Sequence, residues 1–237
     1  MSRPIRSTGA SPRVLLVMTS QARSPIGEKI GLSLVEFSVV YYALTERRFD
    51  LILASPQGGM PPIDLASNGI SAPSMTRLRE DWETRGALSD TLRLEQIVTE
   101  DVSAVIYLGG AGALWDLPTH AASQAIIRTF LDEARPLGLI GQGVAALCWA
   151  NGPKGQGPAA GRRLTSVSRT EQTAMGALIP FCVADELRRR GGVHSAGPDG
   201  APLVVRDGAL ITGQNAASAL GVAQAVIEML DQERVVE

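Results

Sequence analysis

The chain alternates between short apolar runs and longer segments whose apolar residues recur at helical spacing. Short continuous runs are typical of strands buried on both faces, and helical spacing is typical of helices with one buried face. The predicted strands are Val14–Met18, Asp50–Ala54, Ala104–Leu108, Leu137–Ile140 and Arg163–Ser168, with a hairpin of Pro202–Arg206 and Ala209–Thr212 around Asp207-Gly208. The predicted helices are Ile30–Leu44, Ala122–Glu133, Pro180–Arg190 and Ala216–Glu233.

This alternation predicts an α/β fold, a doubly wound three-layer sandwich of the flavodoxin-like kind with a mostly parallel sheet. A length of 237 residues is ordinary for one such domain, so we expect residues 13–237 to form a single domain. Residues 1–12 mix Ser, Pro, Arg and Gly without periodicity and are expected to be a flexible tail. Residues 64–102 are mixed and polar, which indicates an insertion or cap over the sheet edge.

Composition narrows the possible partners. A formal net charge of −2 and the lack of a long basic run argue against nucleic-acid binding. No apolar stretch approaches membrane-spanning length and the N-terminus lacks the hydrophobic core of a signal peptide, so we expect a cytoplasmic protein that does not bind membranes. Cys148 and Cys182 lack metal-ligand spacing and are expected to be buried free thiols. No metal site is predicted, since the sequence has no His/Cys cluster, and no cofactor is predicted, since the Gly-rich loops lack the phosphate-loop lysine and the dinucleotide fingerprint.

The stretch Arg135–Asn151 carries the most informative pattern. The apolar run Leu137–Ile140 stops at Gly141-Gln142-Gly143, and helix formers follow at once. This predicts a strand, a turn too tight for most side chains, and a helix whose first amide groups point back at the turn. The arrangement matches a nucleophile elbow at the carboxyl edge of the sheet, yet a glycine, Gly141, stands where the nucleophile would be.

A second Gly-rich turn follows the strand Ala104–Leu108. It begins with Gly109-Gly110 and is followed by Leu114-Trp115-Asp116. Glycines at such a turn let the backbone approach a ligand closely and leave amides free to point into a pocket.

Several stretches of the chain resemble the ThiJ/PfpI superfamily, which has the type-1 glutamine-amidotransferase-like fold, and among its branches the glyoxalase III/chaperone-like one. The matching stretches are Leu32–Glu36 with the following helix, ASPQGGMPPID, YLGGAGALWDLP and LITGQNAASALGVAQAV, together with PFCVADELRRRGG. The resemblance covers most of the chain from Val14 to Leu230, and it implies the same α/β fold and a homodimer.

The resemblance also implies which positions carry chemistry. Members of this branch place cysteine, histidine and glycine at the elbow, and these fall on Gly141, Gln142 and Gly143 here. The family's glutamate, which sits against the cysteine sulfur, matches Glu36. The histidine of the family's Gly-Gly-His-Gly loop is replaced by Ala111. The family's acidic residue after the next strand falls on Arg169, with Glu171 two positions on.

Without a thiolate, this site cannot form the hemithioacetal or thioester that family glyoxalases and amidotransferases would use. Cys148 lies too far along the helix to substitute. We therefore expect Glu36 to be catalytic, as a carboxyl group in an apolar-walled pocket whose raised pKa lets it exchange protons near neutrality. The ordinary alternative is a helix-surface glutamate. Gly141 is open to two interpretations, relief of backbone strain in an abandoned site or enlargement of the pocket for a bulkier substrate.

Other positions are candidates for substrate binding. The amides of Gly110, Gln142 and Gly143, with Gly109 beside them, are expected to bind an oxyanion or carboxylate. The Gln142 side chain can orient a ligand but cannot shuttle a proton. Trp115 is either a stacking surface for a flat ligand or a packing residue, and Arg169 either binds an anionic group or is a solvated surface arginine.

Two functions follow from these observations. In the first, the protein is a cofactor-free enzyme that uses Glu36 as general acid/base on a small carbonyl or aromatic substrate. The candidate reactions are an aldehyde–amine condensation of the Pictet–Spengler type, or a lyase or hydratase step, in secondary metabolism. In the second, it is a non-catalytic homologue that binds a small molecule or acts as a chaperone-like or regulatory partner. The discriminating residue is Glu36.

Overall fold

The computed structural model describes residues 11–64, 72–149, 157–174 and 179–236. Most of the predicted flexible tail, and residues 65–71 of the predicted cap, lie outside the described residues. A seven-stranded sheet with the order β3-β2-β1-β4-β5-β9-β8 forms the centre of the fold. Only the pairing of β8 with β9 is antiparallel, and the other pairs are parallel.

The strands of this sheet are β1 (Arg13–Val17), β2 (Asp50–Ser55), β3 (Leu92–Arg93), β4 (Ala104–Tyr107), β5 (Leu137–Ile140), β8 (Val204–Asp207) and β9 (Leu210–Gly213). Two further strands, β6 (Arg163–Leu164) and β7 (Val193–His194), pair in parallel as a separate small sheet. The register places Val17 of β1 between Ala54 and Tyr107, so the carboxyl ends of the central strands lie level. This levelling brings the loops after β1, β4 and β5 to one edge.

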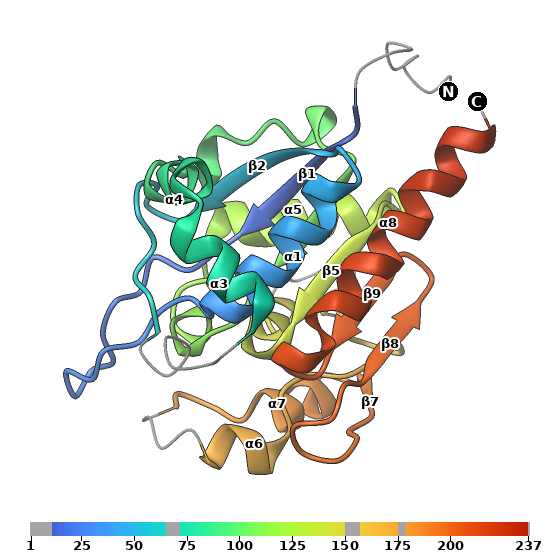
Figure 1. Cartoon of the computed structure of the whole chain (residues 1–237). Helices are drawn as coiled ribbons and strands as arrows, with labels where there is room; N and C mark the ends of the chain where they lie inside the picture. Colours follow the sequence, from blue (N-terminus) through green and yellow to red (C-terminus); the bar gives the residue numbers. More distant parts are fainter. Residues whose placement is uncertain (1–10, 65–71, 150–156, 175–178, 237) are drawn as a thin grey trace.

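The α-helices are α1 (Leu34–Glu46), α3 (Pro73–Glu80), α4 (Trp82–Ser89), α5 (Ala121–Asp132), α6 (Arg169–Ala174), α7 (Val183–Arg189) and α8 (Ala219–Val236). The 3₁₀ helices are η1 (Leu94–Gln96), η2 (Thr99–Asp101), η3 (Ala111–Leu114), η4 (Gly141–Leu147) and η5 (Ala216–Ser218). Figure 1 shows α1, α3 and α8 on one face of the sheet, α5 on the other, and α6, α7 and β7 gathered at one end.

The apolar side chains divide between two cores because successive residues of a strand point to opposite faces. Leu16 of β1 packs with residues of α1, α3 and α8, whereas Leu15 packs with residues of α5, η4 and α7. Val105 and Ile106 of β4 divide in the same way. The prediction of an α/β sandwich with helices on both faces of a mostly parallel sheet is therefore confirmed.

Some predicted elements differ from the structure. The predicted strand Arg163–Ser168 is limited to β6, because the Thr165 amide donates to the side-chain hydroxyl of Thr212 in β9 instead of to a backbone carbonyl of a neighbouring strand. The hairpin turns at Gly208 and Ala209 rather than at Asp207-Gly208, since Asp207 still pairs with Leu210. Gly208, at a φ of 62°, supplies the left-handed conformation that such a turn requires.

The polar segment 64–102 contributes more than a cap. In its described part, the helices α3 and α4 place Met75, Leu78 and Leu88 in the core beside α1. Its short strand β3 extends the sheet next to β2. Apolar residues are sparse in this segment, and their spacing does not distinguish helix from loop, which explains why these helices were not predicted.

Candidate functional site

The candidate site lies where the strand order reverses, between β1 and β4. The chain runs from β1 outward to β2 on one side and from β4 to β5 on the other. Loops at such a point diverge and leave a crevice at the carboxyl ends of the strands, where ligands bind in open α/β sheets. Glu36 comes from α1, Gly109 and Gly110 follow β4, and Gly141 follows β5.

Helix capping directs Glu36 into the protein. Ser33 is the N-cap of α1, and its hydroxyl accepts a hydrogen bond from the Glu36 amide. A glutamate at the third helical position usually reaches back to the N-cap amide. Here the Ser33 amide instead donates to the carbonyl of Gly109, at 3.0 Å, and the Gly109 amide donates to Glu36 Oε2, at 2.7 Å. Glu36 is thereby fixed to the loop after β4 and is only 3% exposed.

The burial of Glu36 changes its acidity. Desolvation disfavours the charged carboxylate and is the largest influence, the Gly109 amide acts in the opposite direction, and the negative charge of Asp64 adds a smaller raise. The net result raises the pKa of Glu36 from 4.5 to about 7. The carboxyl group therefore exchanges a proton near neutral pH, which a general acid/base requires.

Gly141 faces the second oxygen of this carboxyl group. Its φ is 53°, a left-handed conformation in which a side chain would be strained. A Cβ built on Gly141 would lie 3.2 Å from Glu36 Oε1, with Gln214 O and Asn215 Cα next, at 3.9 and 4.0 Å. A side chain at this position would thus point at Glu36, which is the relation that the sequence resemblance implied for the elbow residue.

Close backbone approach explains the other glycines of the site. A Cβ on Gly110 would lie 2.2 Å from the carbonyl oxygen of Gly31, and one on Gly109 would lie 2.9 Å from that of Ile140. A Cβ on Gly143 would lie 2.8 Å from the carbonyl oxygen of Leu108. These glycines allow the loop after β4 to pack against both α1 and η4, and this packing closes the site around Glu36.

Gln142 is buried beside them. Its side-chain Oε1 accepts a hydrogen bond from the Gly110 amide at 3.3 Å. The oxygen of Gln142 therefore occupies the acceptor position on Gly110 that was predicted for a ligand oxyanion. An incoming ligand oxygen must displace this side chain to bind the Gly110 amide.

The predicted helix after Gly141 is a 3₁₀ helix, η4, rather than an α-helix. Its residues, from Gly141 to Leu147, are all buried. Cys148, at its end, is buried in the core shared with α5 and α7. Burial raises the pKa of this thiol to about 12, with a smaller raise from Glu186. The Cys148 thiol is therefore un-ionised at neutral pH and does not replace an elbow nucleophile.

Two predicted binding residues, Trp115 and Arg169, make their contacts with parts of the protein other than Glu36. Trp115 is partly buried and packs against the core on the α5 side of the sheet, whereas the residues of α1 pack on the other side. Arg169 begins α6, and its exposed guanidinium pairs with Asp185 of α7. The structure thus supports the packing interpretation of Trp115 and the surface interpretation of Arg169.

Three polar residues border the site without having been selected from the sequence as site residues. Gln214 and Asn215, in the turn after β9, lie next to Gly141. Glu171 of α6 accepts hydrogen bonds from both of their side chains. The dipeptide Gln214-Asn215 lies in one of the stretches that carry the family resemblance, which was the available signal.

One Ser–His pair outside the site is held in an unreactive form. His194 Nε2 lies 2.9 Å from the Ser166 hydroxyl, and Arg188 approaches Nδ1 at 3.0 Å. A guanidinium only donates, so Nδ1 accepts and the ring proton is on Nε2, facing Ser166. Burial, with the charge of Arg188 adding to it, lowers the pKa of His194 to about 4 and keeps it neutral. His194 therefore cannot take a proton from Ser166.

Within the described residues, His, Cys, Asp and Glu side chains form no group of three or more that could hold a metal ion. Among the helices of the same residues, none is sufficiently long and apolar to cross a bilayer.

Comparison with known proteins gives the following likenesses. No family model matches the chain. It is 31% identical over 186 residues to the human "Glutamine amidotransferase-like class 1 domain-containing protein 1", which covers 77% of this chain and 81% of that protein. The structure of Rapid Encystment Protein 24 kDa from Francisella tularensis has a TM-score of 0.86 and 28% identity, covering 91% of this chain and 97% of that one. The structure of glyoxalase III from Candida albicans has a TM-score of 0.77 and 23% identity, covering 92% of this chain and 96% of that one.

Proposed function

Because the chain belongs to the ThiJ/PfpI (DJ-1/glutamine amidotransferase-like class 1) superfamily, we propose that it is a cofactor-independent enzyme whose catalytic residue is Glu36. One observation carries this proposal, the buried Glu36 carboxyl with a pKa of about 7 beside the side-chain-free Gly141. A carboxyl group of this kind donates a proton in its acid form and accepts one in its ionised form at the same pH.

The geometry divides two tasks between the carboxyl oxygens. Oε2 is fixed by the Gly109 amide, and within the described residues no group donates a hydrogen bond to Oε1. Oε1 faces the position above Gly141 where a side chain would otherwise stand. We assign Oε1 to proton exchange with substrate and Oε2 to anchoring. Gly141 and Gln142, which border Oε1 and the Gly110 amide, are the proposed substrate-binding residues.

The proposed substrate is a small compound with a carbonyl group, and one of the superfamily likenesses is to a glyoxalase III. Protonated Glu36 would donate to the carbonyl oxygen as a nucleophile adds to the carbonyl carbon. Ionised Glu36 would then accept the proton that the nucleophile releases. Proton balance is maintained because the same carboxyl group gives one proton and takes one. Addition of an amine to an aldehyde, the first step of a Pictet–Spengler condensation, and hydration both fit this scheme.

The scheme does not need a thiol. At Gly141 no sulfur is present, and Cys148, the nearest cysteine along the chain, is un-ionised in the core. We therefore propose that the protein does not follow the thiol-dependent route of family glyoxalases. Cys182, which was predicted to be buried, is only partly buried. Its alkylation by iodoacetamide is expected to leave turnover unchanged.

The test is a product screen with matched variants. Small aldehydes, alone and mixed with primary aromatic amines, are incubated with wild type, Glu36→Gln and Glu46→Gln, and products are identified by mass spectrometry. Glu46 is an exposed glutamate at the end of the same helix and serves as the control. Product formation by wild type and Glu46→Gln that falls by about 10²-fold or more in Glu36→Gln is the expected result.

Two other outcomes contradict the proposal. Equal turnover by wild type and Glu36→Gln would show that another group does the chemistry. Binding of aldehydes or amines to all three proteins, detected by thermal shift and without any product, would favour a small-molecule-binding homologue that is not an enzyme.

A further inference from the structure

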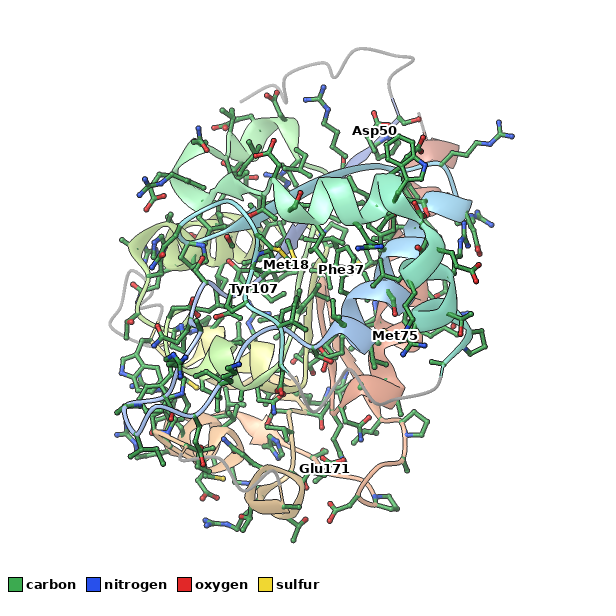
Figure 2. The ribbon with its side chains drawn as sticks, turned by 60° about the vertical axis from the view of Figure 1, so that its left-hand side comes forward. Met18, Phe37, Asp50, Met75, Tyr107 and Glu171 are labelled. Atoms are coloured by element: carbon green, nitrogen blue, oxygen red, sulfur yellow. The ribbon has the colours of Figure 1, made fainter. Side chains whose placement is uncertain are left out.

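One carboxylate at the carboxyl end of the sheet collects hydrogen bonds from three separate segments. Glu171 Oε1 accepts from the Gly200 amide at 2.8 Å and from Asn215 Nδ2 at 2.7 Å. Oε2 accepts from the Ser168 amide at 3.0 Å and from Gln214 Nε2 at 3.1 Å. Figure 2 shows Glu171 at the lower end of the molecule, with α6 and well apart from Phe37 and Tyr107 in the interior.

Helix capping explains only one of these contacts. The Glu171 amide donates to the Ser168 hydroxyl at 3.0 Å, so the pair forms a reciprocal cap at the start of α6. A cap needs no bond to Gly200, Gln214 or Asn215. Those three contacts instead link α6 to the loop before β8 and to the turn after β9.

The linked segments enclose Gly141 from two sides. The carbonyl of Gln214 and the Cα of Asn215 lie 3.9 and 4.0 Å from the position of a Cβ on Gly141. The amide of Val167, just before Ser168, donates to the carbonyl of Gly141 at 3.5 Å. A shift of either segment would therefore change the space above Gly141, which Glu36 Oε1 also borders.

Glu171 has the charge state suited to holding these donors. Partial burial acts to raise its pKa, but the Gly200, Asn215, Ser168 and Gln214 hydrogen bonds together outweigh burial and hold the pKa below the usual glutamate range. The carboxylate is thus ionised at neutral pH and accepts only. Its chemistry differs from that of Glu36, which exchanges its proton in that pH range.

We propose that Glu171 is a positioning residue of the candidate site, whose carboxylate fixes the Gln214–Asn215 turn against Gly141 and so sets the wall that faces Glu36. The importance of this wall for substrate rests on the proposed function. The placement of the wall by Glu171 does not, and it can be measured without a substrate.

The experiment uses a thiol probe in the full chain. Gly141→Cys places a cysteine beside Glu36 Oε1. The rate of its alkylation by iodoacetamide is followed by mass spectrometry of the peptide that contains residue 141. The rate is measured at a pH where it no longer changes with pH. The probe is combined with Glu171→Gln and, as a matched control, with Asp199→Asn. Asp199 accepts from Ser168 and Thr170 at the same end of α6, at 2.8 Å each, and among the described contacts it touches neither Gln214 nor Asn215.

Glu171→Gln turns one acceptor oxygen into a donor that faces other donors. The Gln214–Asn215 turn is expected to loosen, and the rate of alkylation at residue 141 should rise about tenfold. This is the size of effect expected for the loss of one charge-assisted hydrogen bond. Asp199→Asn should change the rate by less than about twofold, since it leaves the wall contacts intact. Adding Gln214→Glu to Glu171→Gln restores one donor–acceptor match and should recover part of the difference.

Equal alkylation rates in the Glu171→Gln and Asp199→Asn backgrounds would overturn the proposal, as would a rate that only follows the fall in melting temperature of each variant. If Glu171→Gln does not fold, Asn215→Ala removes one of the two wall contacts and should accelerate alkylation in the same direction. A failure of the product screen leaves this experiment unaffected, so the two proposals fail separately.

Discussion

Glu36 makes the stability of the protein depend on pH in a direction that can be calculated. Its pKa is 4.5 in the unfolded chain and about 7 in the folded one. The folded state therefore binds the proton more tightly, and between these pH values the unfolded state binds fewer protons than the folded state. Stability is fully present below pH 4.5, falls as the pH rises, and reaches a constant lower level above pH 7.

The size of the effect follows from the shift. A change from 4.5 to about 7, at roughly 1.4 kcal/mol per pKa unit, corresponds to about 3 kcal/mol of unfolding free energy. Screening by solvent reduces this little, because Glu36 is only 3% exposed. A glutamine has nearly the same shape, can still accept from the Gly109 amide, and does not ionise. Glu36→Gln should therefore match wild type below pH 4.5 and exceed it by about 3 kcal/mol above pH 7.

Urea unfolding of wild type, Glu36→Gln and Glu46→Gln across this pH range measures the difference. Other titrating groups, His194 among them, contribute equally to all three proteins and cancel in the comparison. The Glu46→Gln curve should follow wild type. A difference between wild type and Glu36→Gln that stays constant with pH would refute the reasoning, because Glu36 would then have the same acidity folded and unfolded.

Three further predictions concern the glycines and thiols of the site. Gly141→Cys should lower the free energy of unfolding, measured in urea, by about 1–2 kcal/mol, because a side chain is strained at a φ of 53°. The thiol that this substitution introduces should have a pKa that changes when Glu36→Gln is added. Gly110→Ala should lower the free energy of unfolding by about 3 kcal/mol or more, because its Cβ would lie 2.2 Å from a carbonyl oxygen. Gly200→Ala should lower it by only about 1 kcal/mol, because Gly200 has a left-handed φ but no atom within 4 Å of the added Cβ. In the folded protein at neutral pH, Cys148 should not react with a disulfide reagent and should become reactive on unfolding, so rapid native labelling at Cys148 would contradict its burial.

The sequence pattern predicted the architecture well where the chain is apolar. The runs Val14–Met18 and Ala104–Leu108 became the central strands β1 and β4, because a strand covered on both faces needs continuous apolar residues. The pattern failed at Arg163–Ser168, where the Thr165 amide bonds to the side chain of Thr212 and the Ser166 hydroxyl bonds to His194. It also failed in the described part of 64–102, whose two short helices have few apolar residues. In both segments long-range contacts, not local spacing, decide the structure.

For the site, the glycine turns after the predicted strands indicated Gly109, Gly110 and Gly141, and the resemblance indicated Glu36; the structure brings these four residues together. Neither signal could show the two hydrogen bonds that turn Glu36 inward, from the Ser33 amide to the Gly109 carbonyl and from the Gly109 amide to Glu36, because both need the loop after β4 in place. Nor could they show that Glu171, two positions from Arg169, accepts hydrogen bonds from the side chains of Gln214 and Asn215 beside Gly141. The spacing of charges along the chain does not reveal which of them a fold buries.

The energetics of Gly141 and Glu36 favour a working site over an abandoned one. Glycine at a φ of 53° removes backbone strain of about 1–2 kcal/mol, so stability alone is a sufficient reason for its presence. Glu36 has the opposite effect, since burial of its carboxyl group costs about 3 kcal/mol once the group ionises. A site shaped only by stability would place a neutral side chain at residue 36, where glutamine fits. The combination of a relaxed elbow with a costly buried carboxyl group therefore supports the proposed function, in which the protein has no elbow nucleophile and depends on Glu36.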